Sequence, residues 1–69
     1  MNTLDLHGVR HHEVDRIVEN FIFLNQKEIP LIIICGNSLK MITLVKTVTS
    51  RIGCEIHEPY FGVIIVRNI

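Results

Sequence analysis

The chain has no long apolar segment and few cysteines. Its longest uninterrupted apolar run is Leu31 to Cys35, whereas a membrane-spanning helix needs about 20 apolar residues, so we expect no membrane association. The first residues lack a basic stretch followed by an apolar one, and a cytoplasmic location is therefore the default expectation. Cys35 and Cys54 are too few for a disulfide scaffold and form no C-x-x-C pair, so both are interpreted as reduced. A single bridge between them is the alternative.

The composition is that of one thin globular domain. Of 69 residues, 48% are hydrophobic and only 20% are charged, which excludes a disordered tail as the main interpretation. A chain of this length buries about 60% of the surface that its unfolded form exposes. We therefore expect one domain over residues 1–69 with a small core.

The charges cancel in total but not along the chain. Seven Lys and Arg balance seven Asp and Glu, which argues against the strongly basic surface of a typical nucleic-acid-binding protein. Between Ile29 and Cys54, however, three basic residues occur and no acidic one, whereas the segment from His11 to Glu28 is mainly acidic. The two halves of the chain therefore differ in charge.

The apolar spacing predicts six elements in the order βαβαββ. Strands are expected at residues 3–6, 31–35, 54–58 and 62–67, and helices at 10–27 and 39–52, with a turn at 59–62. Asn37 or Ser38 is expected to cap the second helix and Gly53 to end it. Right-handed crossovers place both helices on one face of the sheet. The predicted fold is an α/β (α+β) two-layer sandwich with a four-stranded mixed sheet and its two helices on one face.

Two segments are expected to meet at one edge of this sheet. The first strand ends in Asp5-Leu6-His7-Gly8 and the second in Cys35-Gly36-Asn37-Ser38, and the carboxyl ends of parallel strands collect ligands. Asp5 and His7 lie two residues apart and so project to one side. They are candidates for an acid/base pair or the start of a metal site, although a solvated or hydrogen-bonded polar pair is the commoner arrangement.

The second helix carries a basic and hydroxyl-bearing face. Together with the free backbone amides of residues 36–40, this face is suited to binding phosphates without reading sequence. An ordinary solvated helix face that merely lacks acids is an equally good interpretation. Its members are Lys40, Thr43, Lys46, Thr47, Ser50 and Arg51.

Other chemistry is less well supported by the sequence. His7, His11 and His12 form no established metal-ligand pattern, so a histidine metal site is a minor alternative. The loop at Gly36 lacks the spacing of a nucleotide-hydrolysing P-loop. Cys35 ends a buried strand and is interpreted as a core residue and not as a nucleophile.

The segment Leu4-Asp5-Leu6-His7-Gly8, followed by the predicted elements, resembles the small MutS-related (Smr) domain along almost the whole chain. The resemblance implies a fold similar to the C-terminal domain of translation initiation factor three. It also implies a domain that acts on nucleic acid, because members of this family nick or cleave DNA or RNA. Asp5 and His7 then match the proposed active site of the family, and Gly8 allows the close turn that follows.

The second family motif, usually His or Thr followed by Gly-x-Gly, is matched only in part. Gly36 is kept, but Cys35 and Ser38 replace the first and last motif positions. Loss of the second glycine removes backbone freedom where a phosphate would approach, although the Ser38 hydroxyl can cap the helix. The residues expected to bind nucleic acid or phosphate are Gly8, Gly36, Asn37, Ser38, Lys40, Lys46 and Arg51.

The sequence thus predicts an Smr-like nucleic-acid-binding domain with endonuclease activity through Asp5 and His7. The alternative is a catalytically degenerate module that only binds branched or single-stranded nucleic acid or a protein partner. No cofactor is firmly implied, and Mg²⁺ or Mn²⁺ would be the metal of a nuclease. Ile22, Phe23 and the segment from Val63 to Val66 exceed what one thin core should absorb, and this favours a homodimer or a docking surface for a protein.

Overall fold

A computed structural model describes residues 2–69 as four strands, two α-helices and one 3₁₀ turn. No helix within this part of the chain is long and apolar enough to cross a bilayer. The elements follow one another as β1 (Thr3–Asp5), α1 (His11–Leu24), η1 (Gln26–Glu28), β2 (Leu31–Ile34), α2 (Leu39–Ile52), β3 (Glu55–Tyr60) and β4 (Val63–Asn68).

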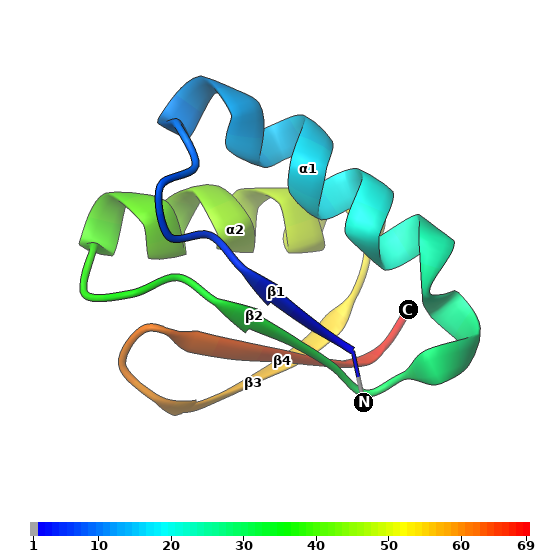
Figure 1. Cartoon of the computed structure of the whole chain (residues 1–69). Coiled ribbons are helices and arrows are strands. Elements are labelled where there is room, and N and C mark those ends of the chain that lie inside the picture. Colours follow the sequence, from blue (N-terminus) through cyan, green and yellow to red (C-terminus); the bar gives the residue numbers. More distant parts are fainter. Residues whose placement is uncertain (1) are drawn as a thin grey trace.

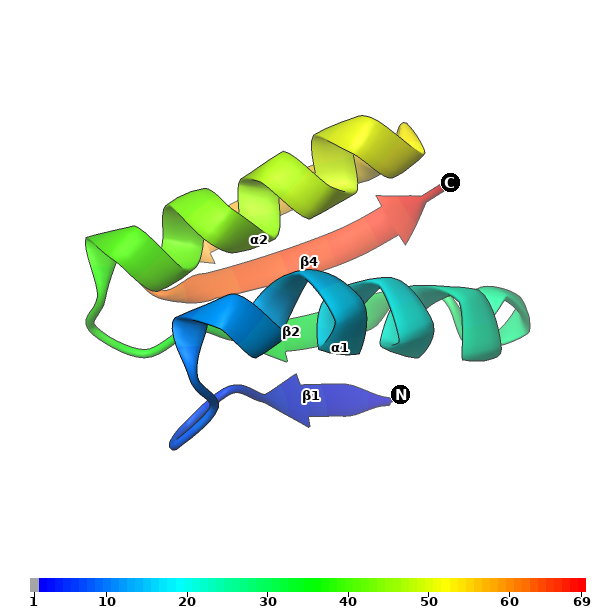
Figure 2. The ribbon, with the colours of Figure 1, turned by 90° about the horizontal axis from the view of Figure 1, so that it is seen from above.

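The predicted α+β architecture is confirmed. The sheet has the order β1-β2-β4-β3, in which β1 and β2 are parallel and the two other pairs are antiparallel. Both helices cover the same face of the sheet and lie side by side above it (Figures 1 and 2). β1, α1 and β2 form a βαβ unit, which requires a crossover helix because its strands are parallel.

The core lies between this sheet face and the two helices. Leu31 and Ile33 of β2 and Ile64 and Val66 of β4 are fully buried, as the alternation of a strand with one covered face requires. The helices contribute residues at three- and four-residue spacing. The buried helical residues are Val14, Val18 and Ile22 of α1, and Met41, Ile42, Val45, Val48 and Thr49 of α2.

The second face of the sheet is not covered by any element within residues 2–69 (Figure 1). Ile32 and Ile34 of β2 point to it, and so do Val63 and Ile65 of β4, since they alternate with buried residues. All four are half-buried. The apolar surplus of the last strand therefore lies on this open face.

Three sequence-based expectations need correction. The first helix, expected over residues 10–27, ends at Leu24, and a separate 3₁₀ turn follows it. Ile22 is fully buried in the core and does not contribute to an exposed surface, whereas Phe23 is 48% exposed. The turn expected at residues 59–62 is shorter, because β3 continues through Pro59 to Tyr60. Proline is tolerated there because β3 is an edge strand, and the pairing with β4 shifts between His57 and Tyr60.

Candidate functional site

The two segments expected to meet do lie at one edge of the sheet. In the parallel pair of β1 and β2, Asp5 is opposite Ile34, and the N–H of Leu6 donates to the carbonyl oxygen of Ile34 at 3.0 Å. Both helices begin at this edge, immediately after the two loops (Figure 1). The chain therefore brings the Leu4–Gly8 segment and the Gly36 loop together through strand pairing alone.

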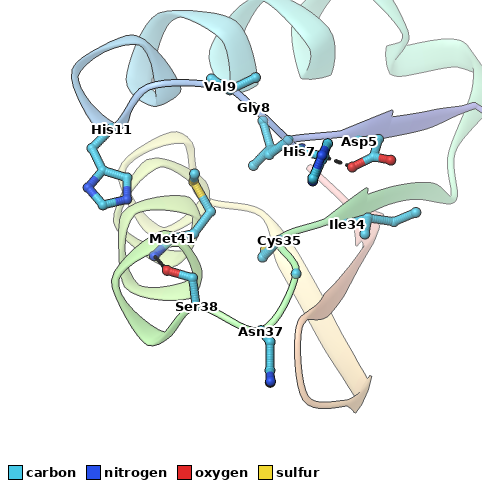
Figure 3. A pocket seen from close by; sticks show the side chains of 12 residues that line it. Asp5, His7, Gly8, Val9, His11, Ile34, Cys35, Asn37, Ser38 and Met41 are labelled. Atoms are coloured by element: carbon cyan, nitrogen blue, oxygen red, sulfur yellow. Dashed lines mark hydrogen bonds between the residues drawn. The ribbon is translucent and has the colours of Figure 1, made fainter.

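A pocket of about 510 Å³ lies between these two loops. Asp5 and His7 lie at its strand side and His11 and Met41 at its helix side, while the side chain of Asn37 points away from the others (Figure 3). Backbone groups and small residues make up much of the remaining wall. Its full lining is Asp5, Leu6, His7, Gly8, Val9, His11, Ile34, Cys35, Gly36, Asn37, Ser38 and Met41.

Asp5 and His7 are joined through a tight turn and not through their side chains. The backbone N–H of His7 donates to Oδ1 of Asp5 at 2.9 Å, and both residues are exposed. Gly8 follows with φ +80°, a conformation that non-glycine residues rarely adopt. The Asp5 carboxylate thus fixes the turn that presents the imidazole, and its second oxygen remains available to a ligand.

The second loop is held by a helix cap. Oγ of Ser38 accepts a hydrogen bond from the backbone N–H of Met41 at 3.2 Å, so Ser38, and not Asn37, is the N-cap of α2. Gly36 has φ +75°. Since the hydroxyl of Ser38 accepts the capping bond, its own proton is free for an acceptor in the pocket.

Cys35 is a neutral thiol at the base of this loop. Its residue is 6% exposed, and burial, assisted by the charge of Glu58, raises the pKa of the thiol to about 11. A protonated thiol is a poor nucleophile, which agrees with the interpretation of Cys35 as a core residue. Cys35 and Cys54 are both free.

The basic face of α2 is partly neutralised by ion pairs. Nζ of Lys46 lies 2.7 Å from Oε2 of Glu58, and the Arg51 guanidinium lies 2.8 Å from Oδ2 of Asp15 and 3.2 Å from Oε2 of Glu19. The Arg51 guanidinium holds the pKa of the Asp15 carboxyl below its usual value. Within residues 2–69, Lys40 has no carboxylate within 4.0 Å, so its charge is not offset by an ion pair.

Sequence reasoning gave too little weight to the first turn of α1. Arg10 precedes this helix, and its exposed side chain lies with His11 and His12 around a second, more open pocket. His11 also lines the first pocket. The run Arg10-His11-His12 directly after the Gly8 turn was the available signal, but only the structure shows that His11 shares a pocket with the Gly36 loop.

The side chains of the site give little support for a resident metal ion. Within residues 2–69, no group of three or more His, Cys, Asp or Glu side chains is placed to hold a metal ion. Asp5 is the carboxylate that lines the first pocket. Because Mg²⁺ is commonly held by one or two carboxylates together with substrate phosphates, the residues present fit a metal that arrives with a phosphate-bearing ligand better than a resident one.

Comparisons with protein-family models, curated proteins and solved structures find no match for this chain.

Proposed function

We propose that this chain is an Smr-like domain that binds DNA or RNA at the edge of the sheet and cleaves a phosphodiester bond there. One observation supports this most: residues 5–8 and the Gly36 loop, far apart in sequence, line the same pocket. The pocket combines a carboxylate, two imidazoles and the start of a helix, which suits a phosphate group and acid/base chemistry.

Each group has a role in the proposed reaction. Hydrolysis adds water across one P–O bond, so a proton must leave the attacking water and another must reach the departing oxygen. His7 is proposed to take the proton from the attacking water, the departing oxygen takes its proton from solvent, and Asp5 holds the turn that orients His7. Backbone amides of residues 36–40 and the Lys40 ammonium would hold the phosphate. If Mg²⁺ or Mn²⁺ takes part, Asp5 would be its protein ligand beside the substrate oxygens, where the ion would offset negative charge.

A cleavage assay tests the proposal. Labelled single-stranded, duplex and branched DNA and RNA are incubated with the protein in Mg²⁺, Mn²⁺ or chelator, and binding is followed by mobility shift. We expect Asp5→Ala together with His7→Ala to abolish cleavage and to leave binding largely intact. Asp5→Asn keeps an oxygen that can accept a hydrogen bond from the backbone N–H of His7. This variant therefore shows whether cleavage needs the charge of Asp5 or only its role in the turn.

A matched histidine provides the control. His57 is an exposed residue of β3 outside the pocket lining, and His57→Ala should cut at the rate of the wild type. Removing a general acid or base typically costs about 10²- to 10⁴-fold in rate. If the Asp5/His7 double variant cuts as fast as the wild type, the proposed catalytic assignment is wrong.

The binding surface is tested separately through salt dependence. A lysine that contacts phosphate contributes about one unit to the salt slope of the binding constant. We expect Lys40→Gln to lower this slope more than Lys46→Gln, because Lys46 already pairs with Glu58. Equal effects would mean that the ion pair opens when nucleic acid binds.

A binding-only domain is the second candidate, and the state of Cys35 favours it. The family motif usually has an imidazole or a hydroxyl at this position, whereas here burial keeps a thiol neutral. Under this proposal the wild type shifts nucleic acid but cuts none of the substrates under any metal condition. If it neither shifts nor cuts, both candidates are wrong and a protein partner becomes the next object of search.

A further inference from the structure

Two large aromatic side chains are exposed at the same edge of the sheet as the pocket. Tyr60 ends β3 and is 68% exposed, and Phe61 follows it in the β3–β4 turn and is 60% exposed. In Figure 1 this turn lies at the left, with the loop that leads into α2 and with the starts of both helices. Neither aromatic residue lines the pocket or belongs to the core.

The β3–β4 turn, which carries Phe61, is attached to the Gly36 loop through backbone contacts. The N–H of Cys35 donates to the carbonyl oxygen of Gly62 at 2.7 Å. Gly62 is packed so closely on Gly36 that a Cβ on Gly62 would lie 2.5 Å from the Gly36 carbonyl oxygen. Phe61 therefore sits one residue from a fixed contact with the candidate phosphate-binding loop.

The strand register gives the distance that a ligand would have to span. Asp5 is opposite Ile34, Ile34 is opposite Val63, and Val63 is opposite Tyr60. Asp5 and Tyr60 are thus separated by three inter-strand spacings of about 4.8 Å each, which gives a distance of about 14 Å. At about 3.4 Å per nucleotide of stacked strand, that is a span of at most about four nucleotides.

Asp5 is the carboxylate in the pocket itself, whereas the charge next to the aromatic pair is offset. Glu58, the carboxylate on β3 that precedes the aromatic pair, is engaged with Lys46 at 2.7 Å, and Lys40 lies in the first turn of α2 without an ion-pair partner within residues 2–69. Proteins that bind single-stranded nucleic acid combine exposed aromatic side chains with groups that bind the phosphate backbone. The aromatic side chains accept any sequence because every base can stack on them.

We propose that Tyr60 and Phe61 form a stacking surface for unpaired bases of a single-stranded nucleic acid whose phosphate lies in the pocket between Asp5 and Ser38. This inference rests on the proposed nucleic-acid binding and specifies its substrate class. Stacked bases of a duplex do not offer their faces to the turn, so the surface discriminates in favour of single strands, loops and frayed ends.

Binding measurements on three ligands test the proposal. Fluorescence anisotropy is used with a labelled single-stranded 12-mer, its duplex, and an abasic 12-mer that keeps the phosphates but lacks bases. We expect the wild type to prefer the single strand. Phe61→Ala and Tyr60→Ala should each weaken single-strand binding by about 5- to 150-fold, the range measured for loss of one base–aromatic stack. Binding of the duplex and of the abasic strand should not change.

The chain offers a direct reporter and a matched control. It contains no tryptophan, so Phe61→Trp introduces a single indole at the proposed surface, and its fluorescence should be quenched by the base-bearing strand but not by the abasic one. Phe23 is 48% exposed and lies one residue before the end of α1, whereas the pocket is lined by His11 at the start of that helix. Phe23→Ala should leave all three affinities unchanged.

The outcomes separate this inference from the proposed function. If the wild type binds nucleic acid and Phe61→Ala and Tyr60→Ala bind the single strand as tightly, the stacking surface is refuted and the proposed binding stands. Equal weakening toward single, duplex and abasic strands also refutes it, since that pattern reports a disturbed loop. If the wild type binds none of the ligands, the proposed function fails, and the stacking surface fails with it.

Discussion

Gly62 packs on the main chain of Gly36, so closely that a Cβ on Gly62 would be 2.5 Å from the carbonyl oxygen and 3.1 Å from the carbonyl carbon of Gly36. Gly62 also has φ +90°, which a residue with a side chain rarely adopts. The contact joins the β3–β4 turn to the loop that precedes α2. The shape of the candidate site therefore depends on a residue that lies outside its pocket.

Gly62→Ala should destabilise the domain by about 2–4 kcal/mol, because it combines a strained backbone with a clash against main-chain atoms. For a domain of this size, each kcal/mol lowers the melting temperature by about 4–8 °C. Gly53→Ala is the matched control, since Gly53 has φ +92° but no neighbour within 4 Å of its Cβ position. Its cost should be about 1 kcal/mol. Equal melting temperatures for the two variants would show that the Gly36 contact can relax freely.

Ser38 allows the stability of α2 to be separated from phosphate binding. Ser38→Ala removes the acceptor of the Met41 N–H and should cost about 1 kcal/mol in the free energy of unfolding. Ser38→Asp keeps an N-cap acceptor and interacts favourably with the helix dipole, so its unfolding free energy should stay near that of the wild type. Its carboxylate would nevertheless repel a phosphate in the pocket.

Urea unfolding and anisotropy together check this prediction. We expect Ser38→Asp to be stable but to bind nucleic acid more weakly than Ser38→Ala does. If Ser38→Asp binds as tightly as the wild type, the phosphate does not approach the start of α2.

What the sequence could predict was mainly local. Helix α2 begins after Ser38 and ends at Gly53 as expected, because an N-cap hydroxyl and a glycine C-cap with φ +92° act within one turn. The meeting of the two loops also followed from the parallel pairing of β1 with β2. These features depend on spacing that can be counted along the chain.

Contacts between distant residues could not be predicted in this way. The ion pair between Arg51 and Asp15 joins residues 36 positions apart, and the spacing of charges along α2 gives no sign of it. The close approach of Gly62 to Gly36 depends on β4 lying between β2 and β3. Ile22 was expected to belong to an apolar surplus, but it lies four residues after the buried Val18 and is itself buried.

Thiol labelling should show that both cysteines react slowly in the folded protein. Burial raises the pKa of the Cys35 thiol to about 11 and that of the Cys54 thiol above its usual value, so little thiolate is present near neutral pH. At pH 7.5 the folded protein should react with an aromatic disulfide reagent far more slowly than a small free thiol does. After denaturation, two thiols per chain should react at once. The Cys35→Ser variant retains only Cys54, so its rapid labelling would contradict the prediction for Cys54. Rapid labelling of the Cys54→Ser variant would contradict the prediction for Cys35.

The Arg51–Asp15 pair predicts a specific acid dependence of stability. Arg51 lies on α2 and Asp15 on α1, and two N–H groups of the guanidinium donate to the two carboxylate oxygens at 2.8 and 2.9 Å. The pKa of Asp15 is lowered in the folded state, so the folded protein binds this proton less readily than the unfolded chain does. The stabilisation is therefore present above the unfolded pKa of about 3.9 and is lost as the pH falls through the lower folded value.

Asp15→Asn removes this titration and keeps the shape of the side chain. We expect it to melt at a lower temperature than the wild type at pH 7, by a modest amount because the pair is exposed, and the difference should shrink as the pH falls below the unfolded pKa and through the lower folded value. High salt should shrink the difference at pH 7. In an Arg51→Gln background, Asp15→Asn should cause no such pH-dependent difference. A difference that stays constant from pH 7 to pH 2, or that persists without Arg51, would show that the stabilisation by Asp15 does not come from this ion pair.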